Sequence, residues 1–86
     1  MRFDLEHRDR RATLTTGSGV VRVSDERGRV ASCEAPEPLR LVDRTPLSVR
    51  VRDASGRVFG VRLTERGPEL AGDGFGGVTL SAPTPA

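Results

Sequence analysis

Cysteine and histidine are scarce in this chain of 86 residues: Cys33 is the only cysteine and His7 the only histidine. One cysteine excludes an internal disulfide, and the two residues are too few for a zinc site of the usual four-ligand kind. Tryptophan, tyrosine and isoleucine are absent, so the core must come mainly from valine, leucine and three phenylalanines. A core this thin is commonly stabilised by association, so we expect a homo-oligomer, either a dimer or a larger assembly.

Long apolar runs are absent as well. No run approaches the ~18 uncharged apolar residues of a membrane helix, and the N-terminal segment MRFDLEHRDRR has no apolar stretch like that of a secretory signal. We therefore expect a soluble, cytoplasmic protein. The length leaves room for one domain, which we place at residues 1–81, followed by a disordered proline-rich tail at 82–86.

Lysine, asparagine and glutamine are also missing, whereas arginine occurs 14 times against 12 acidic residues, for a net charge of +2. A high-GC bacterial genome, which we expect as the source, would replace lysine by arginine without any selection for binding. The arginine count is therefore weak evidence for nucleic-acid binding, and the modest net charge is the better guide.

Apolar residues recur at every second position in nearly every segment, which is the period of β-strands, and no helical stripe extends over ten residues. The first hairpin is predicted to turn at residues 9–10. This turn sets Leu5 opposite Leu14 and brings the apolar faces of the two strands together.

A ten-residue segment occurs twice with an offset of 28 residues: residues 21–30, VRVSDERGRV, and residues 49–58, VRVRDASGRV, share seven identities. In each copy an Asp is followed three positions later by a Gly. The Asp can open a type I turn by accepting a backbone N–H, and the Gly can adopt the left-handed conformation of the bulge that follows. We therefore predict two hairpins whose valines face a shared interior, with Val51 opposite Phe59 in the second.

Further short strands are expected at Leu39 and Leu41, from Leu47 onward, and at residues 78–80, with a turn at 65–68. Residues 34–38 contain two prolines, which cannot donate to a sheet ladder, so they are predicted to form a crossing loop. Seven to eight short strands separated by turn signals predict an all-β fold. We expect a small antiparallel β-sandwich, or a barrel-like fold, with an internal hairpin repeat; the sandwich is favoured.

Each residue that could carry catalysis has a structural interpretation that we favour. Cys33 and His7 would suit a nucleophile and its base, but the hairpin register turns Cys33 toward the apolar face, and His7 lies at the rim of the first strand. Ser18 lies in a Gly-Ser-Gly turn without the nucleophile-elbow pattern. Asp4 and Glu6 share the solvated face of a strand. We expect no enzymatic activity, no catalytic residue, no metal ligand and no cofactor.

Residues 72–77, GDGFGG, form the only glycine-rich tract. The tract lacks the Gly-Lys-Ser/Thr ending and the following helix of a phosphate-binding loop, and Asp73 alone offers too few ligands for calcium. We interpret it as a hairpin tip. Phe75 is then either an exposed contact anchor or a side chain that folds back to fill the core.

The polar face of the two predicted hairpins gathers arginines. Arginines that lie close together repel each other unless acidic residues or the anions of a partner lie between them. The face is therefore either balanced by nearby glutamates or used for binding. Our candidate binding residues are Arg22, Arg50, Arg52, Arg62 and Phe75.

The sequence favours a non-catalytic protein–protein interaction or assembly module that associates with itself or with a protein partner. The alternative is binding of nucleic acid or another polyanion through the arginine-rich sheet face, which would weaken steeply with added salt. That alternative is second because few aromatic residues are available for stacking with bases. We expect no membrane contact and no small-molecule cofactor.

Overall fold

The structure, a computed structural model, describes residues 1–80. Within that range the chain forms eight β-strands and one short 3₁₀ turn, and no helix is long and apolar enough to cross a membrane. The elements are β1 (Arg2–His7), β2 (Arg10–Gly17), β3 (Val20–Asp25), β4 (Val30–Glu34), β5 (Arg40–Thr45), β6 (Ser48–Arg52), β7 (Val58–Thr64), β8 (Gly67–Ala71) and η1 (Asp73–Phe75). The predicted domain end at 81 and the predicted tail at 82–86 lie outside the described residues.

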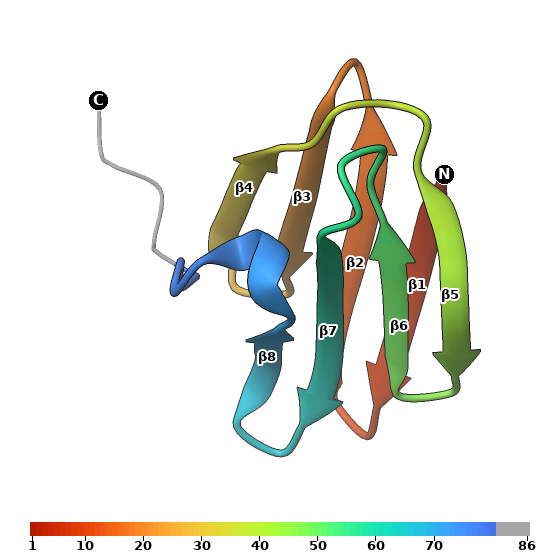
Figure 1. The fold of residues 1–86 in the computed structure, drawn as a ribbon. Helices are drawn as coiled ribbons and strands as arrows, with labels where there is room; N and C mark the ends of the chain where they lie inside the picture. Colours follow the sequence, from red (N-terminus) through yellow and green to blue (C-terminus); the bar gives the residue numbers. More distant parts are fainter. Residues whose placement is uncertain (81–86) are drawn as a thin grey trace, which may run out of the picture.

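The strands form two antiparallel sheets, β1-β2-β3-β4 and β5-β6-β7-β8 (Figure 1). Strand alternation sets their buried faces: in β3, Val21 and Val23 are buried, whereas Arg22 between them is exposed. The buried faces pack against each other around one core. Within residues 1–80 no strand of one sheet pairs with the other sheet, so the predicted sandwich is confirmed and the barrel is excluded. The core residues are Phe3, Leu5, Ala12, Leu14, Val21, Val23, Ala35, Val49, Val51, Phe59, Val61, Leu63 and Phe75.

The internal repeat is longer in the structure than in the sequence. A shift of 28 residues places β3 and β4 on β6 and β7, and it also places most of β2 on β5. The ladder registers agree, because Val23 faces Ala31 in the first copy and Val51 faces Phe59 in the second, as predicted. Each sheet therefore contains one copy of a three-stranded meander and one additional strand. β1 precedes the first copy, and β8 follows the second.

The predicted register of the first hairpin is wrong by two residues. β1 and β2 are joined by a turn at Arg8-Asp9, and Leu5 lies opposite Ala12 rather than Leu14. Arg8 has a φ of 57°, so a residue other than glycine supplies the left-handed conformation of this tight turn. A shift of two residues leaves every side chain on the same face, and hydrophobic alternation therefore cannot distinguish the two registers.

The last strand was also misplaced by the sequence prediction. Residues 78–80 form no strand, and the final strand is β8, which begins inside the predicted turn at 65–68. β8 includes Pro68, whose missing N–H is tolerated because β8 pairs only with β7 and leaves its other edge free. A proline that argues against a central strand does not argue against an edge strand.

The glycine-rich tract at 72–77 folds onto the core and does not form a hairpin tip. Oδ1 of Asp73 accepts a hydrogen bond of 2.9 Å from the backbone N of Val58, which ties the tract to β7. The ring of Phe75 then meets Phe59 edge-on, with centroids 5.2 Å apart and planes at 87°. Phe75 is 3% exposed, so it fills the core and is not the exposed contact anchor that we considered.

Candidate interaction surfaces

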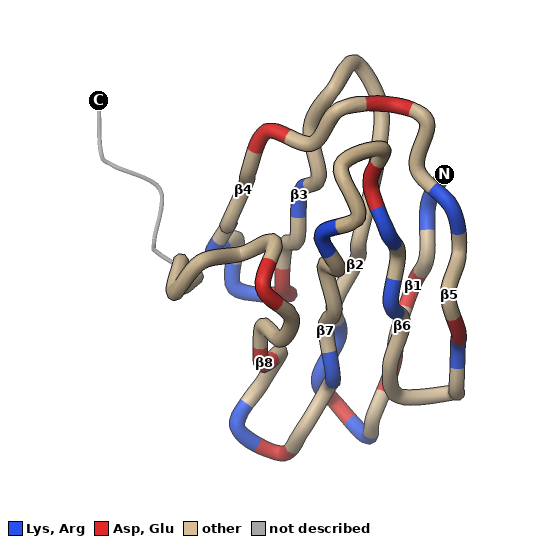
Figure 2. The backbone as a smooth tube through the Cα atoms, viewed as in Figure 1, with Lys and Arg blue, Asp and Glu red and all other residues tan. Residues whose placement is uncertain are grey.

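The four arginines predicted to share a face lie on two faces. Arg22 belongs to β3 of the first sheet, whereas Arg50, Arg52 and Arg62 belong to β6 and β7 of the second. Side chains that alternate with core residues point away from the core, and the outer faces of two packed sheets point in opposite directions. Arg22 therefore lies on the opposite side of the molecule, and basic positions occur on strands of both sheets (Figure 2). The sequence repeat relates strands of different sheets, which alternation alone could not reveal.

Two arginines on the outer face of the second sheet have acidic neighbours. Nε of Arg50 donates to Oδ1 of Asp43 at 3.0 Å, and Nη2 of Arg50 donates to the other carboxylate oxygen. These hydrogen bonds lower the pKa of Asp43 and raise that of Arg50. Arg62 lies directly opposite Glu69 in the ladder between β7 and β8. The charge of Arg50 is therefore balanced by an ion pair, and Arg62 has an acidic residue opposite it in the ladder.

Arg52 has a basic neighbour instead. In the ladder between β5 and β6 it lies opposite Arg40, which the sequence prediction did not include. Both residues are exposed, and neither forms an ion pair with a carboxylate of residues 1–80. Alternation with Leu39 and Leu41 already places Arg40 on a polar face. The sequence alone did not show that β5 pairs with β6, and this pairing is what places Arg40 opposite Arg52.

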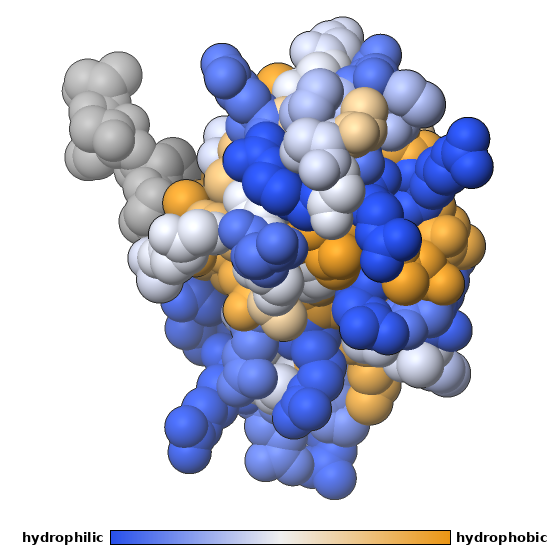
Figure 3. Space-filling view, viewed as in Figure 1, coloured by the Kyte–Doolittle hydropathy of each residue, from blue (hydrophilic) through white to orange (hydrophobic). Residues whose placement is uncertain are grey.

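β5 is an edge strand of the second sheet that carries two exposed apolar side chains. Leu41 is 48% exposed and Val42 is 40% exposed. The register against β6 shifts between Leu41 and Asp43, so Val42 is the extra residue of a β-bulge. Hydrophobic surface is visible at the position of β5, at the right of the space-filling view (Figure 3). The adjacent apolar pair Leu41-Val42 breaks the alternation, and this break is the sequence signal that could have predicted the bulge.

Cys33 and His7 are kept apart by the fold. They lie on β4 and β1, the opposite edges of the first sheet. Cys33 faces Val21 in the ladder and packs against the core, as the register predicted. His7 is half-buried at the end of β1 and lines an open hollow between the sheets. In residues 1–80 no group of three or more His, Cys, Asp and Glu side chains is placed to hold a metal ion.

The two repeated hairpins are closed by buried aspartates. Oδ1 of Asp25 accepts hydrogen bonds from the backbone N of Arg27 and of Arg29, at 3.0 and 2.9 Å, and Oδ2 accepts one from Nε of Arg29 at 2.7 Å. Asp53 makes the same pattern with Ser55 and Arg57, and the Ser55 hydroxyl adds a further bond at 2.7 Å. The glycines that follow, at 28 and 56, have φ of 80° and 93°, as predicted. The identical Asp, Gly and Arg of the repeat therefore form one local structure twice.

The pKa of each of these aspartates is lowered. Burial raises the pKa of both carboxyls, but the hydrogen bonds from side chains and backbone outweigh it, so both pKa values lie below the ordinary 3.8. A carboxyl whose pKa is depressed by folding stabilises the fold above the unfolded pKa. That contribution is lost as the pH falls through the folded value.

We expect Asp25→Asn to lower the free energy of unfolding by about 1.5 kcal/mol at pH 7, because it removes charge-assisted hydrogen bonds from a buried group. The difference from the parent protein should start to shrink as the pH falls below about 4, the pKa of an unfolded aspartate, and should be lost only below the lowered pKa of folded Asp25. Urea denaturation at pH 7 and pH 3 measures both effects. Asp9→Asn is the control, since Asp9 is exposed and its carboxylate forms no ion pair within residues 1–80. Equal losses for the two variants would contradict the assignment.

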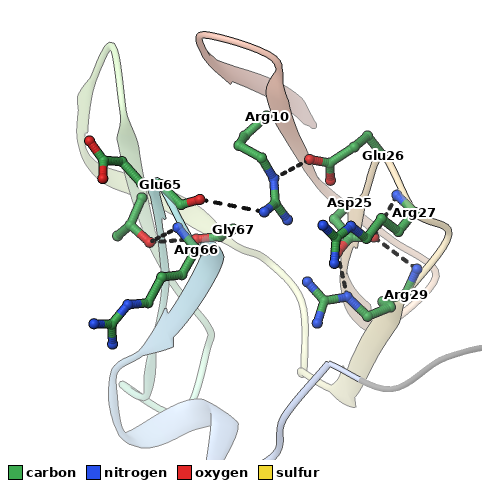
Figure 4. A network of polar contacts seen from close by, with 9 residues as sticks. Arg10, Asp25, Glu26, Arg27, Arg29, Glu65, Arg66 and Gly67 are labelled. Atoms are coloured by element: carbon green, nitrogen blue, oxygen red, sulfur yellow. Dashed lines mark hydrogen bonds and ion pairs between the residues drawn. The ribbon is translucent and has the colours of Figure 1, made fainter.

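A third polar cluster joins the two sheets at one end of the sandwich (Figure 4). Arg10 of β2 forms an ion pair with Glu26, and its Nη1 lies 3.5 Å from the carbonyl oxygen of Glu65 in the turn between β7 and β8. Its Nη2 is buried and has no hydrogen-bond partner in residues 1–80. Gly67 covers this atom so closely that a Cβ there would lie 2.7 Å from it. No ligand atom has room to reach Nη2, so we regard the cluster as a structural link.

Comparisons with protein-family models, with curated proteins and with solved structures gave no significant match to the chain. Its function must therefore be inferred from its own residues. Two surface features are not explained by the packing of the domain itself: the exposed apolar edge at β5, and the opposed pair Arg40 and Arg52.

Proposed function

We propose that the chain is a non-catalytic assembly module that binds a second copy of itself by pairing of the two β5 edges. The observation that carries this proposal is the exposure of Leu41 and Val42 on a free sheet edge. An edge strand offers unpaired N–H and C=O groups, and monomeric proteins commonly protect such edges with charges, proline or a covering segment. β5 carries three charged residues and a bulge, but unlike the other edges it combines open backbone groups with two exposed apolar side chains, which is the chemistry of strand addition.

The other three edges are less suited to pairing. β8 carries Pro68, and β4 has only five residues. The exposed positions along β1 are charged, with Arg2, Asp4 and Glu6 alternating with the core residues. Large hydrophobic side chains that are exposed within residues 1–80 occur in no strand other than β5.

A second copy fits the charge pattern of β5. In an antiparallel pair that sets Leu41 opposite Val42 of the second copy, Arg40 lies opposite Asp43, and charges of opposite sign meet. A shift of one residue in one direction would set Arg40 opposite Arg44, so that like charges would meet, and a shift in the other direction would set Arg40 opposite Val42 and leave it without a charge partner. The charges therefore favour the register that also joins the apolar side chains, and the contact is self-complementary, as a two-fold dimer requires.

Val42→Lys should weaken this association by about tenfold or more, because it places a charge in an apolar contact without a partner. Light scattering coupled to size-exclusion chromatography over a range of concentrations gives the dissociation constant. The parent protein should be dimeric at high concentration and should dissociate on dilution.

Val78→Lys is the matched control, since Val78 is 39% exposed but lies outside the strands. It should leave the dissociation constant unchanged, and circular dichroism should show the same strand content in both variants. A parent protein that stays monomeric at every concentration, or an equal loss for both variants, would overturn the proposal.

A further inference from the structure

The opposed pair Arg40 and Arg52 has the geometry of an anion-binding site. Residues directly opposite each other in an antiparallel ladder have Cβ atoms about 5 Å apart, so the two long side chains can direct their guanidinium groups to one point above the sheet. Like charges placed this way repel each other. An anion between them would turn that repulsion into two charge-assisted hydrogen-bonded contacts.

The carboxylates that neighbour the pair along the ladder and along the chain already accept hydrogen bonds from other residues. Asp43, two rows along the ladder beyond Leu41 and Val51, is bound by two nitrogens of Arg50. Asp53 follows Arg52 directly, but its oxygens accept hydrogen bonds from Ser55 and Arg57 within the hairpin turn. No acidic side chain within residues 1–80 forms an ion pair with Arg40 or Arg52. The two positive charges are therefore available to an external anion.

The pair borders a concave surface. A hollow of about 300 Å³ is lined by Arg40 and Arg52 together with Pro38, Asp53 and Ala54. The backbone N of Ala54 donates to the carbonyl oxygen of Pro36 at 3.0 Å, which joins the two loops that flank the hollow. The backbone around the hollow is fixed, because Arg40 and Arg52 are paired in the ladder and Pro38 has a restricted φ. A small ligand would lose correspondingly little affinity to ordering of the site.

The surrounding charge limits what the hollow can hold. Elsewhere on this face Arg50 is paired with Asp43, and Arg62 lies opposite Glu69 in the ladder. Arg40 and Arg52 lie opposite each other instead, so positive charge without a facing acidic residue is concentrated at this pair. A polynucleotide needs a row of basic contacts and usually aromatic rings for stacking. All three phenylalanines are buried in the core. One compact, doubly charged group fits this arrangement better than a polyanion does.

We infer that Arg40 and Arg52 bind a single phosphate monoester group, carried either by a small phosphorylated metabolite or by a phosphorylated side chain of a protein. Arginine suits this role because its planar guanidinium presents paired N–H donors to phosphate oxygens. The site lies on the outer face of the second sheet and is complete within one copy. Pairing of the β5 edges would compete with it, because that pairing sets Asp43 of the second copy opposite Arg40.

Nuclear magnetic resonance titration tests this inference with inorganic phosphate, O-phosphoserine and a phosphoserine hexapeptide as probes. The Nε–H signals of Arg40 and Arg52 should shift saturably with inorganic phosphate. Arg52→Ser and Arg40→Ser should each weaken binding by about tenfold or more. Arg62→Ser is the matched control: it removes the same charge from the same face and should change the affinity by less than about twofold.

The outcomes separate the two sources of the phosphate and the polyanion alternative. Equal affinity for O-phosphoserine and the hexapeptide supports a metabolite, and tighter binding of the hexapeptide supports a phosphorylated protein. The inference is overturned if no probe binds saturably, or if Arg62→Ser weakens binding as much as Arg52→Ser. It is also overturned if a single-stranded 12-nucleotide DNA binds more tightly than every phosphomonoester, with a steep dependence on salt.

Discussion

Phe59→Ala should lower the free energy of unfolding by about 4 kcal/mol, a large part of the total stability of a domain of this size. Phe59 is fully buried at the centre of the second sheet, and it meets Phe75 edge-on. The glycine at 74 lies so close to the Phe59 ring that a Cβ there would be 2.7 Å from three ring atoms. Removal of the ring therefore leaves a cavity and also removes the contact that holds the C-terminal part of the fold.

Urea denaturation followed by circular dichroism measures this loss. Phe59→Leu keeps most of the volume and should lose less than about 1.5 kcal/mol, so it remains measurable even if Phe59→Ala does not fold. Val78→Ala, at an exposed position, should change the stability by less than about 0.5 kcal/mol. A loss below about 1 kcal/mol for Phe59→Ala would show that Phe59 and Phe75 do not form the centre of the core.

Gly72→Ala should lower the free energy of unfolding by about 3 kcal/mol, because two penalties act at one position. Gly72 has a φ of 92°, which L side chains rarely adopt. A Cβ at this position would also lie 2.3 Å from the carbonyl oxygen of Val58, a backbone atom of β7 that cannot move without disturbing the sheet.

Gly77→Ala separates the two penalties. Gly77 has a φ of 85°, but a Cβ there would meet no atom within 4 Å. It should lose only about 1 kcal/mol from the backbone conformation. The difference between the two variants in thermal or urea unfolding then reports the close approach of Gly72 to β7. Equal losses would show that the contact with Val58 is absent in solution.

Local patterns predicted much of this fold. The repeated Asp-x-x-Gly-Arg segment carries its own turn chemistry, and its registers, such as Val51 opposite Phe59, follow from that chemistry alone. The first hairpin has no such turn signal, since Arg8 adopts a positive φ without being glycine, and its register was missed. β8 was missed because proline in a strand is acceptable only at an edge, and edges are known only after the sheets are assembled.

Which residues share a candidate surface could not be predicted from the sequence for the same reason, because it is decided by how the strands assemble into sheets. Arg22 and Arg50 occupy identical places in the sequence repeat, but the repeat units lie in different sheets, so the two side chains face opposite sides of the molecule. Arg40 became a candidate only when the pairing of β5 with β6 placed it opposite Arg52. Phe75 is not a binding candidate in the structure because its ring is buried against Phe59, a contact between residues of β7 and η1 that the local sequence pattern does not indicate.

Each sheet is built from one uninterrupted half of the chain, and the crossing segment at 35–39 is the sole covalent passage between the halves within residues 1–80. Cleavage in this segment would give two peptides, each containing one four-stranded sheet. The apolar face of each sheet would then be exposed to solvent, because the core is formed by both sheets together. The interior of the fold is therefore complete only when both halves of the chain are present.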